Sequence, residues 1–404
     1  MKDNLLKNFL NYVSFDTISS PTSGLHPSTA HQFDLARALK EELLNLGCQN
    51  VYLSDKCYCY GEIEANDASK PTIGLMAHVD TAPDMSGANV KPKVITSYDG
   101  GDITLNAKLG IIMKADEFPN LKKRVGETIV VTDGTTLLGA DDKAGIAIIM
   151  EIIKTLKDNP NLKHGKIKVC FTPDEEIGEG PDNIDLERFA CDFAYTYDGD
   201  EENIINCENF NAASAYVKIQ GANIHPGSAK DKMKNSIMIA NEFDNLLSPF
   251  ARPQFTQNYE GFNHLNEIKG TVEKTEMKYI IRNHDLTKFA NQKEEFEKAK
   301  KTINAKYGEG TCTVLIEDSY FNMYDIVKTK PEVVERAKDA IRKAGMEPGI
   351  APIRGGTDGA KLTFEGIITP NLGTGGGNYH GKYEYVSVDG MEKAVLVGIN
   401  ILTA

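Results

Sequence analysis

The order of hydrophobic and polar positions predicts alternating helices and buried strands in the first half of the chain. Leucines recur at helical spacing between residues 29 and 46, which predicts an amphipathic helix. Residues 72–79 form a nearly continuous apolar run of strand length, typical of a strand covered on both faces. A helix and two more buried strands are expected at 143–156, 167–172 and 193–197. This alternation predicts a three-layer α/β domain with a mainly parallel sheet.

The pattern changes between residues 210 and 321. In order, we expect a strand, a helix, two strands, a helix and a strand at 213–220, 235–247, 266–272, 277–282, 286–306 and 311–316. This β-α-β-β-α-β order predicts a ferredoxin-like α+β domain, and a continuous larger sheet is the alternative. The α/β pattern returns after it, so we expect 1–209 and 322–404 to form one discontinuous domain with 210–321 inserted.

Composition excludes several classes of partner. The 404 residues include 45 Lys+Arg and 58 Asp+Glu, a formal net charge of -13, which disfavours binding to nucleic acid or to an anionic membrane. No apolar run approaches the ~20 residues of a membrane helix, and the N-terminus lacks the pattern of a signal peptide. The 7 cysteines are scattered, so we expect no structural disulfide. A cytoplasmic protein is the resulting expectation.

Residues suited to catalysis gather where the buried strands end. His78 and Asp80 lie on the same side of the first buried strand, because strand side chains alternate, so Asp80 can orient His78. Asp141 and Asp142 precede a helix, and capping accounts for only one of them. Taken singly, each pair also fits an ordinary strand end or helix cap.

Two more strands end in carboxylates, and a third leads into a glycine-rich loop. Residues 174–176 are three consecutive carboxylates, which repel one another unless they are solvated or neutralised by cations. Asp198 ends the next strand, and an acidic turn is the alternative for both places. The segment 373–381 contains Gly375 and His380, and its glycines let the backbone approach a substrate closely.

These groups are expected to meet, because open α/β sheets bind ligands at the carboxyl ends of their strands. Mixed imidazole and carboxylate ligands suit zinc, with cobalt or manganese as substitutes. Two histidines and several carboxylates are enough for two metals bridged by one carboxylate. The sequence therefore predicts a two-metal hydrolytic site.

Together, the motifs resemble the di-zinc exopeptidases of the carboxypeptidase and aminoacylase type. They are AHVD (77–80), LLGADDKAG (137–145), TPDEEIG (172–178), AYTYDG (194–199), RGGTDGA (354–360) and GGGNYHG (375–381). The resemblance covers essentially the whole chain. It implies a discontinuous di-zinc catalytic domain with a lid or dimerisation domain inserted, and an aminopeptidase that releases the N-terminal residue of tripeptides.

The same resemblance implies a role for individual residues. Glu175 is the implied general base, and Asp80 the carboxylate that orients His78. Asp141 is the implied bridging ligand, joined to Asp142 by a cis peptide bond. The implied ligands of two Zn²⁺ per subunit are Asp141 on both ions, His78 and Asp198 on one ion, and Glu176 and His380 on the other.

Candidates for binding small peptide substrates lie mostly outside this set. His225 resembles a family histidine that reaches the active site from the inserted domain, in some members from a partner subunit, which leaves a homodimer open. A loop histidine beside proline is the alternative. Arg282 and Arg354 suit a substrate carboxylate or a structural ion pair, and Asn235 suits substrate or a helix cap. Gly375 is included for close backbone approach.

Two other functions remain open at the level of sequence. A carboxypeptidase, dipeptidase or deacylase would use the same metals, and only the position of the cleaved bond separates it from an aminopeptidase. A non-catalytic peptide-binding or scaffold protein of the same fold is disfavoured, because every implied ligand and Glu175 are present.

Overall fold

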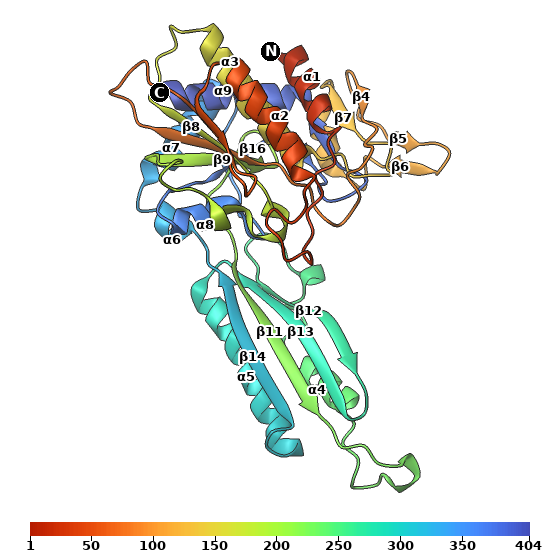
Figure 1. Cartoon of the computed structure of the whole chain (residues 1–404). Helices are drawn as coiled ribbons and strands as arrows, with labels where there is room; N and C mark the ends of the chain where they lie inside the picture. Colours follow the sequence, from red (N-terminus) through yellow and green to blue (C-terminus); the bar gives the residue numbers. More distant parts are fainter. The chain divides into compact units, whose positions relative to one another are not determined.

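The computed structural model describes residues 1–404, which form two compact units (Figure 1). The larger unit is discontinuous and the smaller one is inserted into it. Unit 1 contains Met1–Cys207, Met323–Ala351 and Thr357–Ala404, and unit 2 contains Glu208–Asn322 and Pro352–Gly356.

Unit 2 differs from the predicted inserted domain by Glu208, Asn209 and Asn322 at its ends and by one separate segment. Pro352–Gly356 belongs to unit 2, whereas the sequence analysis placed it in the larger domain. Nη1 of Arg354 donates to the carbonyl oxygens of Asn258 at 2.6 Å and Glu260 at 2.9 Å. These long-range hydrogen bonds hold the segment on unit 2, and no local sequence pattern signals them.

Unit 1 is built on an eight-stranded mixed sheet. Its centre is parallel, because β3 pairs with β8 and β9 in that sense and β9 pairs likewise with β16. In sheet order the strands are β1 (Gln49–Leu53), β2 (Cys59–Ile63), β8 (Ile167–Thr172), β3 (Ile73–His78), β9 (Phe193–Gly199), β16 (Asn371–Gly373), β10 (Ile204–Asn206) and β15 (Gly349–Ile350).

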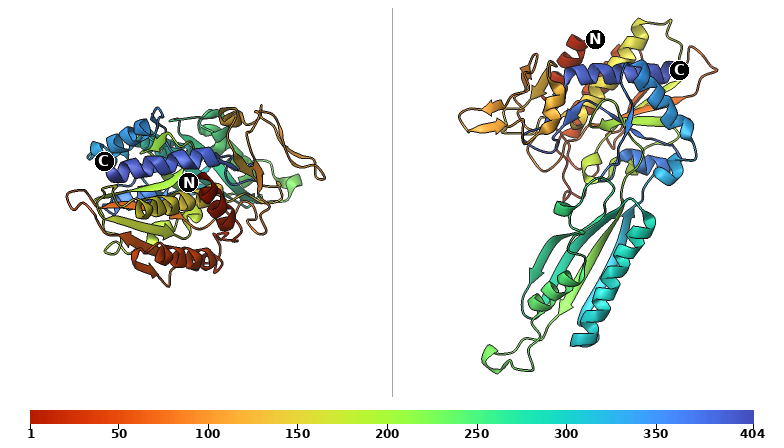
Figure 2. Two further views of the ribbon diagram at one scale, coloured as in Figure 1. Left: turned by 90° about the horizontal axis from the view of Figure 1, so that it is seen from above. Right: turned by 180° about the vertical axis from the view of Figure 1, so that it is seen from behind.

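Helices cover both faces of this sheet (Figure 2). Leu75 packs in the core beneath α3 and α9, and its neighbour Met76 packs on the opposite face with Leu362 of α8, since strand side chains alternate. The predicted three-layer α/β fold is thereby confirmed. The helices of unit 1 are α1 (Lys2–Tyr12), α2 (Gln32–Asn45), α3 (Ala140–Asp158), α6 (Tyr324–Val327), α7 (Pro331–Lys343), α8 (Asp358–Phe364) and α9 (Val388–Thr403).

Six short strands complete unit 1. They were not predicted, because strands of two to four residues carry too little periodicity to be recognised in a sequence. In a four-stranded sheet, Tyr385–Ser387, which follow the glycine-rich loop, pair with Ile129–Val131, more than two hundred residues earlier in the chain. Its strands, in sheet order, are β17 (Gly376–Gly377), β18 (Tyr385–Ser387), β7 (Ile129–Val131) and β4 (Lys93–Ile95), and a separate hairpin pairs β5 (Ile103–Asn106) with β6 (Ile111–Met113).

Unit 2 is an antiparallel four-stranded sheet with two helices on one face (Figure 1). Alternate residues of β11, such as Ala215 and Val217, pack against Phe243 of α4 and Phe296 of α5. The elements are β11 (Asn211–Gln220), α4 (Ser236–Leu246), β12 (Phe262–Gly270), β13 (Lys274–Asn283), α5 (Leu286–Tyr307) and β14 (Cys312–Tyr320). Their chain order β-α-β-β-α-β and the sheet order β12-β13-β11-β14 match the predicted ferredoxin-like fold.

Two expectations about the whole chain can be compared directly with the structure. None of its helices combines the length and the apolar character needed to span a bilayer. All 7 cysteines are free, as expected from their spacing.

Candidate metal centre

The predicted ligands of unit 1 meet at the carboxyl edge of the parallel strands. His78 is the last residue of β3, and Asp198 lies near the end of β9. Glu175 and Glu176 begin the 3-10 turn η2 (Glu175–Ile177), directly after β8, and Asp141 lies in the first turn of α3. Because β3 pairs with both β8 and β9, the ends of these strands lie side by side.

His78 is oriented by Asp80 and faces Asp141 and Asp198. Its Nδ1 lies 3.1 Å from the carbonyl oxygen of Asp80 and 3.3 Å from its Oδ1. Because both are acceptors, Nδ1 carries the proton and leaves Nε2 as a ligand atom. Nε2 lies 2.9 Å from Oδ1 of Asp141 and 3.6 Å from Oδ1 of Asp198.

The second histidine faces the other oxygen of Asp141. Nε2 of His380 lies 3.2 Å from Oδ2 of Asp141 and 3.0 Å from Oε2 of Glu176. The Asp141 carboxylate thus has one histidine on each oxygen, with Asp198 beside the first and Glu176 beside the second. This is the arrangement expected of a carboxylate that bridges two ions.

The donor set fits bound cations. Oε1 of Glu176 is buried and has no hydrogen-bond partner, although a buried carboxylate oxygen is normally paired. Ligand atoms of His78, Glu175 and Asp198 lie within 4.8 Å of one another, as do those of His78, Asp141 and Glu176. Imidazole and carboxylate together are the ligands that zinc prefers.

Burial and mutual repulsion raise the pKa values of several carboxyl groups in the cluster. Burial, together with the nearby Asp141, raises the pKa of Glu176 to about 8. Burial and the adjacent carboxylates likewise raise the pKa of Asp198 to about 6 and that of Glu175 well above its usual range. Hydrogen bonds to Asp141 and Glu176 raise the pKa of His380 to about 11. A cation among these groups would stabilise all the carboxylates in their ionised form.

Asp80 connects the first histidine to the two glutamates. It is fully buried, and its carboxylate accepts the backbone N–H of Glu175 at 3.0 Å and of Glu176 at 3.2 Å. The same carboxylate lies beside Nδ1 of His78 at 3.3 Å. One side chain therefore sets the relative position of a predicted ligand and of the predicted base.

Two buried carboxylates of this region were missed as positioning groups. Glu384 accepts the backbone N–H groups of Leu138, Gly139 and Asp141 at 2.7, 2.8 and 3.0 Å. Asp142, joined to Asp141 by the expected cis peptide bond, accepts the backbone N–H of His78 at 3.2 Å. Glu384 follows the glycine-rich loop with no motif of its own, so no sequence signal marked it.

The substrate-binding candidates of unit 2 make local contacts. Nδ1 of His225 accepts the backbone N–H of Gly227 at 3.1 Å, so Nε2 carries the proton of the neutral ring. Asn235 caps α4 by accepting the N–H of Ile237 at 3.0 Å. Arg282 donates to its own strand at Ile281, 3.0 Å away, and its guanidinium lies over the ring of Tyr320.

The other two candidates are held firmly in place. Besides its two backbone partners, Arg354 donates from Nη2 to Oγ1 of Thr256 at 3.0 Å, and its guanidinium stacks on the ring of Phe210. Gly375 has a φ of +88°, and a Cβ there would lie 2.8 Å from Cα of Gly390, so only glycine fits. Close packing within the fold is thus one reason for this glycine.

A cavity of about 330 Å³ lies apart from the metal cluster. Its lining includes Tyr60 and Glu62 of β2, Lys168 of β8 and Arg188, and it contains none of the candidate ligands. Two of its acidic groups pair with cations of the same lining, Glu62 with Lys168 and Asp185 with Arg188, the latter at 3.5 Å.

The sheet of unit 1 is parallel at its centre and gathers imidazoles and carboxylates at its carboxyl edge, and an α+β unit is inserted into the chain. This combination is typical of a metal-dependent hydrolase. A family model described as "Peptidase family M20/M25/M40" matches residues 132–404, and the chain belongs to this family. It is therefore a peptidase-class hydrolase.

Individual relatives show which members of the family the chain resembles. A protein named peptidase T from Caldanaerobacter subterraneus subsp. tengcongensis is 51% identical over 399 residues, which cover 98% of each chain. The crystal structure of the aminopeptidase PepT from Bacillus cereus superposes with a TM-score of 0.78 at 24% identity, covering 100% of this chain and 98% of that one. A Bacillus subtilis protein described as a dinuclear metal binding peptidase of the M20 family gives a TM-score of 0.66 at 14% identity, covering 100% and 97%.

Proposed function

We propose that the chain is a two-zinc aminopeptidase that removes the N-terminal residue of tripeptides. The observation that carries the proposal is the Asp141 carboxylate, whose two oxygens face His78 at 2.9 Å and His380 at 3.2 Å. The name of the Caldanaerobacter relative supports the substrate class, because similarity extends over 98% of both chains.

The ligand sets follow from the contacts around Asp141. His78 and Asp198 would hold one ion, Glu176 and His380 the other, and Asp141 would bridge them. Two ions held there would supply an activated water near neutral pH and positive charge for a developing oxyanion. The protein supplies the ligand geometry and the proton transfers.

Glu175 is the proposed general base. Its carboxylate lies in the group formed with His78 and Asp198, yet it is not needed as a ligand in the sets above. It takes the proton of the attacking water and delivers it to the leaving amine. Asp80 keeps it in place through the N–H of Glu175 and keeps His78 in the tautomer that binds metal.

His225 is the proposed donor to the substrate from unit 2. With Nδ1 occupied by the N–H of Gly227, its Nε2–H is available to a carbonyl oxygen. Arg282 is the proposed partner of a substrate carboxylate. The printed hydrogen bonds of Arg282 use only Nη1, whereas both Nη1 and Nη2 of Arg354 bond to unit 2 and the Asn235 oxygen caps α4, so these two are less suited to this role.

The test compares free and blocked tripeptides. The purified protein is incubated with Ala-Gly-Phe, N-acetyl-Ala-Gly-Phe and the dipeptide Ala-Gly, and products are identified by mass spectrometry. The proposal requires release of free alanine from the first substrate only. Release of phenylalanine would identify a carboxypeptidase, and hydrolysis of the acetylated peptide a deacylase or carboxypeptidase.

A further inference from the structure

Asp174 directly precedes the proposed base Glu175 and has an unusual backbone conformation. Its φ is +58°, in the left-handed region that non-glycine residues rarely adopt. Its side chain is fully buried. Such a conformation persists only where the surroundings hold it, so its contacts show what positions the turn that follows.

The carboxylate of Asp174 is held by the segment between α1 and α2. It accepts the backbone N–H of Ser28 at 2.6 Å, the hydroxyl of Ser28 at 2.5 Å and Nε2 of Gln32 at 2.6 Å. In return, the backbone N–H of Asp174 donates to Oε1 of Gln32 at 3.1 Å. Both Ser28 and Gln32 are buried, at 4% and 0% exposure, so water does not compete for these bonds.

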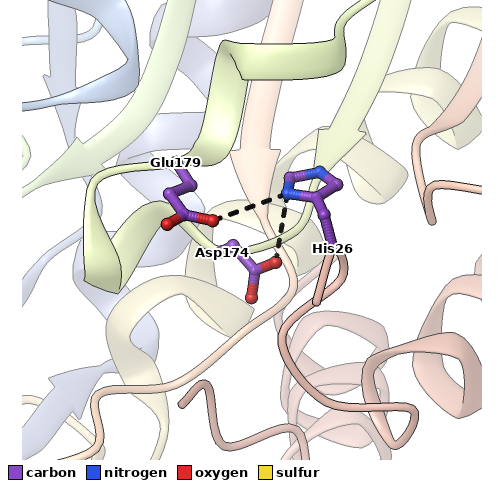
Figure 3. A group of neighbouring side chains, drawn as sticks. All are labelled: His26, Asp174 and Glu179. Atoms are coloured by element: carbon purple, nitrogen blue, oxygen red, sulfur yellow. Dashed lines mark ion pairs between the residues drawn. The ribbon is translucent and has the colours of Figure 1, made fainter. Parts of the chain in front are cut away.

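A second contact of the same N-terminal segment reaches the far end of the turn (Figure 3). Nδ1 of His26 lies 3.5 Å from Oδ2 of Asp174 and 3.8 Å from Oε2 of Glu179. Its Nε2 lies 3.0 Å from the hydroxyl of Tyr58, which donates its only proton to the carbonyl oxygen of Gly180 at 2.5 Å. Tyr58 thus links His26 to Gly180, and the imidazole contacts both ends of segment 174–180.

The turn is thus held from two sides. Asp80 accepts the N–H groups of Glu175 and Glu176 on one side, and Gln32 and Ser28 hold Asp174 on the other. Three of these residues, Ser28, Gln32 and Asp174, are neither proposed metal ligands nor the proposed base. Their polar atoms are paired with one another, so a role in contacting substrate does not explain them.

We propose that Ser28, Gln32 and Asp174 are positioning residues. They hold the turn so that Glu175 is placed to act as the base and Glu176 to act as a metal ligand. The reciprocal amide–carboxylate pair of Gln32 and Asp174 is the central element of this clamp. The proposal rests on the proposed function, because it needs Glu175 to be the base.

A polarity swap tests the clamp. Asp174→Asn places an amide N–H opposite either the amide N–H of Gln32 or the backbone N–H of Ser28, whichever way the amide turns. Gln32→Glu places a carboxylate opposite a carboxylate. In the double variant the new amide donates to the new carboxylate, and the N–H of residue 174 keeps its acceptor. Each single variant is expected to lose about 10²-fold in kcat on Ala-Gly-Phe with little change in KM, and the double variant to regain most of it.

Zinc content and thermal unfolding are measured on the same samples. A displaced Glu176 lowers the zinc retained after dialysis in both single variants, and the double variant restores it. Gln292→Glu is the matched control, because Gln292 is a buried glutamine in unit 2 that bonds Asn283 at 2.8 Å and Asn263 at 2.9 Å. It is expected to lower the melting temperature while leaving kcat per folded molecule unchanged.

Three outcomes are distinguished. The clamp proposal would be overturned if the single variants kept wild-type kcat and zinc content. It would also be overturned if their loss of activity only matched the fraction of unfolded protein and the double variant did not regain it. Ser28→Ala removes one donor without inverting any polarity, and it gives a milder loss of kcat if a single variant does not fold. An inactive wild-type protein would refute the proposed function instead, while zinc retention would still report on the clamp.

Discussion

Glu384 accepts the backbone N–H of Asp141 at 3.0 Å, and this bond joins the loop that carries His380 to the turn that carries the proposed bridging ligand. The carboxylate is 1% exposed and also accepts the N–H groups of Leu138 and Gly139. Only three residues lie between His380 and Glu384 in the chain, so a single loop supplies one proposed ligand and fixes the backbone of another.

Glu384→Gln is therefore expected to weaken both stability and metal binding. The amide can accept with only one oxygen, and each buried N–H left unpaired costs about 1–3 kcal/mol. Urea unfolding should show this loss in the metal-free protein, and equilibrium dialysis should show weaker zinc binding. A variant with wild-type zinc affinity would mean that the Asp141 turn holds its position without Glu384.

Glu175→Gln removes the proposed base but no proposed ligand. We expect kcat for tripeptide hydrolysis to fall by about 10²–10⁴-fold, while zinc content stays at the wild-type value. Initial rates with Ala-Gly-Phe and metal analysis of the same sample check both parts. Glu176→Gln serves as comparison, since it should lower zinc content as well. Full activity of the Glu175 variant would rule out this base.

Metal removal is expected to abolish activity reversibly. After chelation and desalting, the protein should be inactive, and activity should return when about two Zn²⁺ per chain have been added. Co²⁺ and Mn²⁺ are expected to substitute, because imidazole and carboxylate ligands accept them. Calorimetric titration gives the stoichiometry. Full activity with fewer than about two ions would contradict the two-metal arrangement.

The stability of the metal-free protein should fall as pH rises. Burial raises the folded-state pKa of Glu176 to about 8 and that of Asp198 to about 6, above their unfolded values of 4.5 and 3.8. The folded state therefore binds protons more strongly, and this contribution is present at low pH and lost as pH rises toward 8.

Urea midpoints of the chelated protein at pH 6 and pH 8.5 measure the effect, with the lower midpoint expected at pH 8.5. Glu176→Gln should show a smaller decrease, because its side chain does not ionise. A midpoint that rises over this interval would show that the carboxyl groups are already neutralised without metal.

Asn235 separates a structural role from a substrate role. Its side chain caps α4 at 3.0 Å, so Asn235→Ala is expected to lower the free energy of unfolding by about 1 kcal/mol. Asn235→Ser should restore most of the stability, because serine is also a good cap. If Asn235 only caps the helix, both variants keep wild-type KM for tripeptides, and a raised KM in the serine variant would point to substrate contact.

Much of the fold could be predicted because its signals are local. The unbroken apolar run of β3 and the alternating residues of β11 follow from which faces are buried. The four-stranded sheet of β17, β18, β7 and β4 could not be predicted, since the pairing of β18 with β7 joins segments far apart in the chain. The segment Pro352–Gly356 was misassigned for the same reason.

The sequence by itself placed imidazoles and carboxylates at the ends of the buried strands and before a helix. The resemblance of its motifs to the di-zinc exopeptidases then selected His78, Asp141, Glu176, Asp198 and His380 as the expected ligands. Only the tertiary structure decided which groups hold that cluster in place. Asp174 meets Gln32, and Asp141 meets Glu384, through hydrogen bonds across 142 and 243 residues. Such bonds depend on burial and direction in space, neither of which leaves a periodic pattern in the chain.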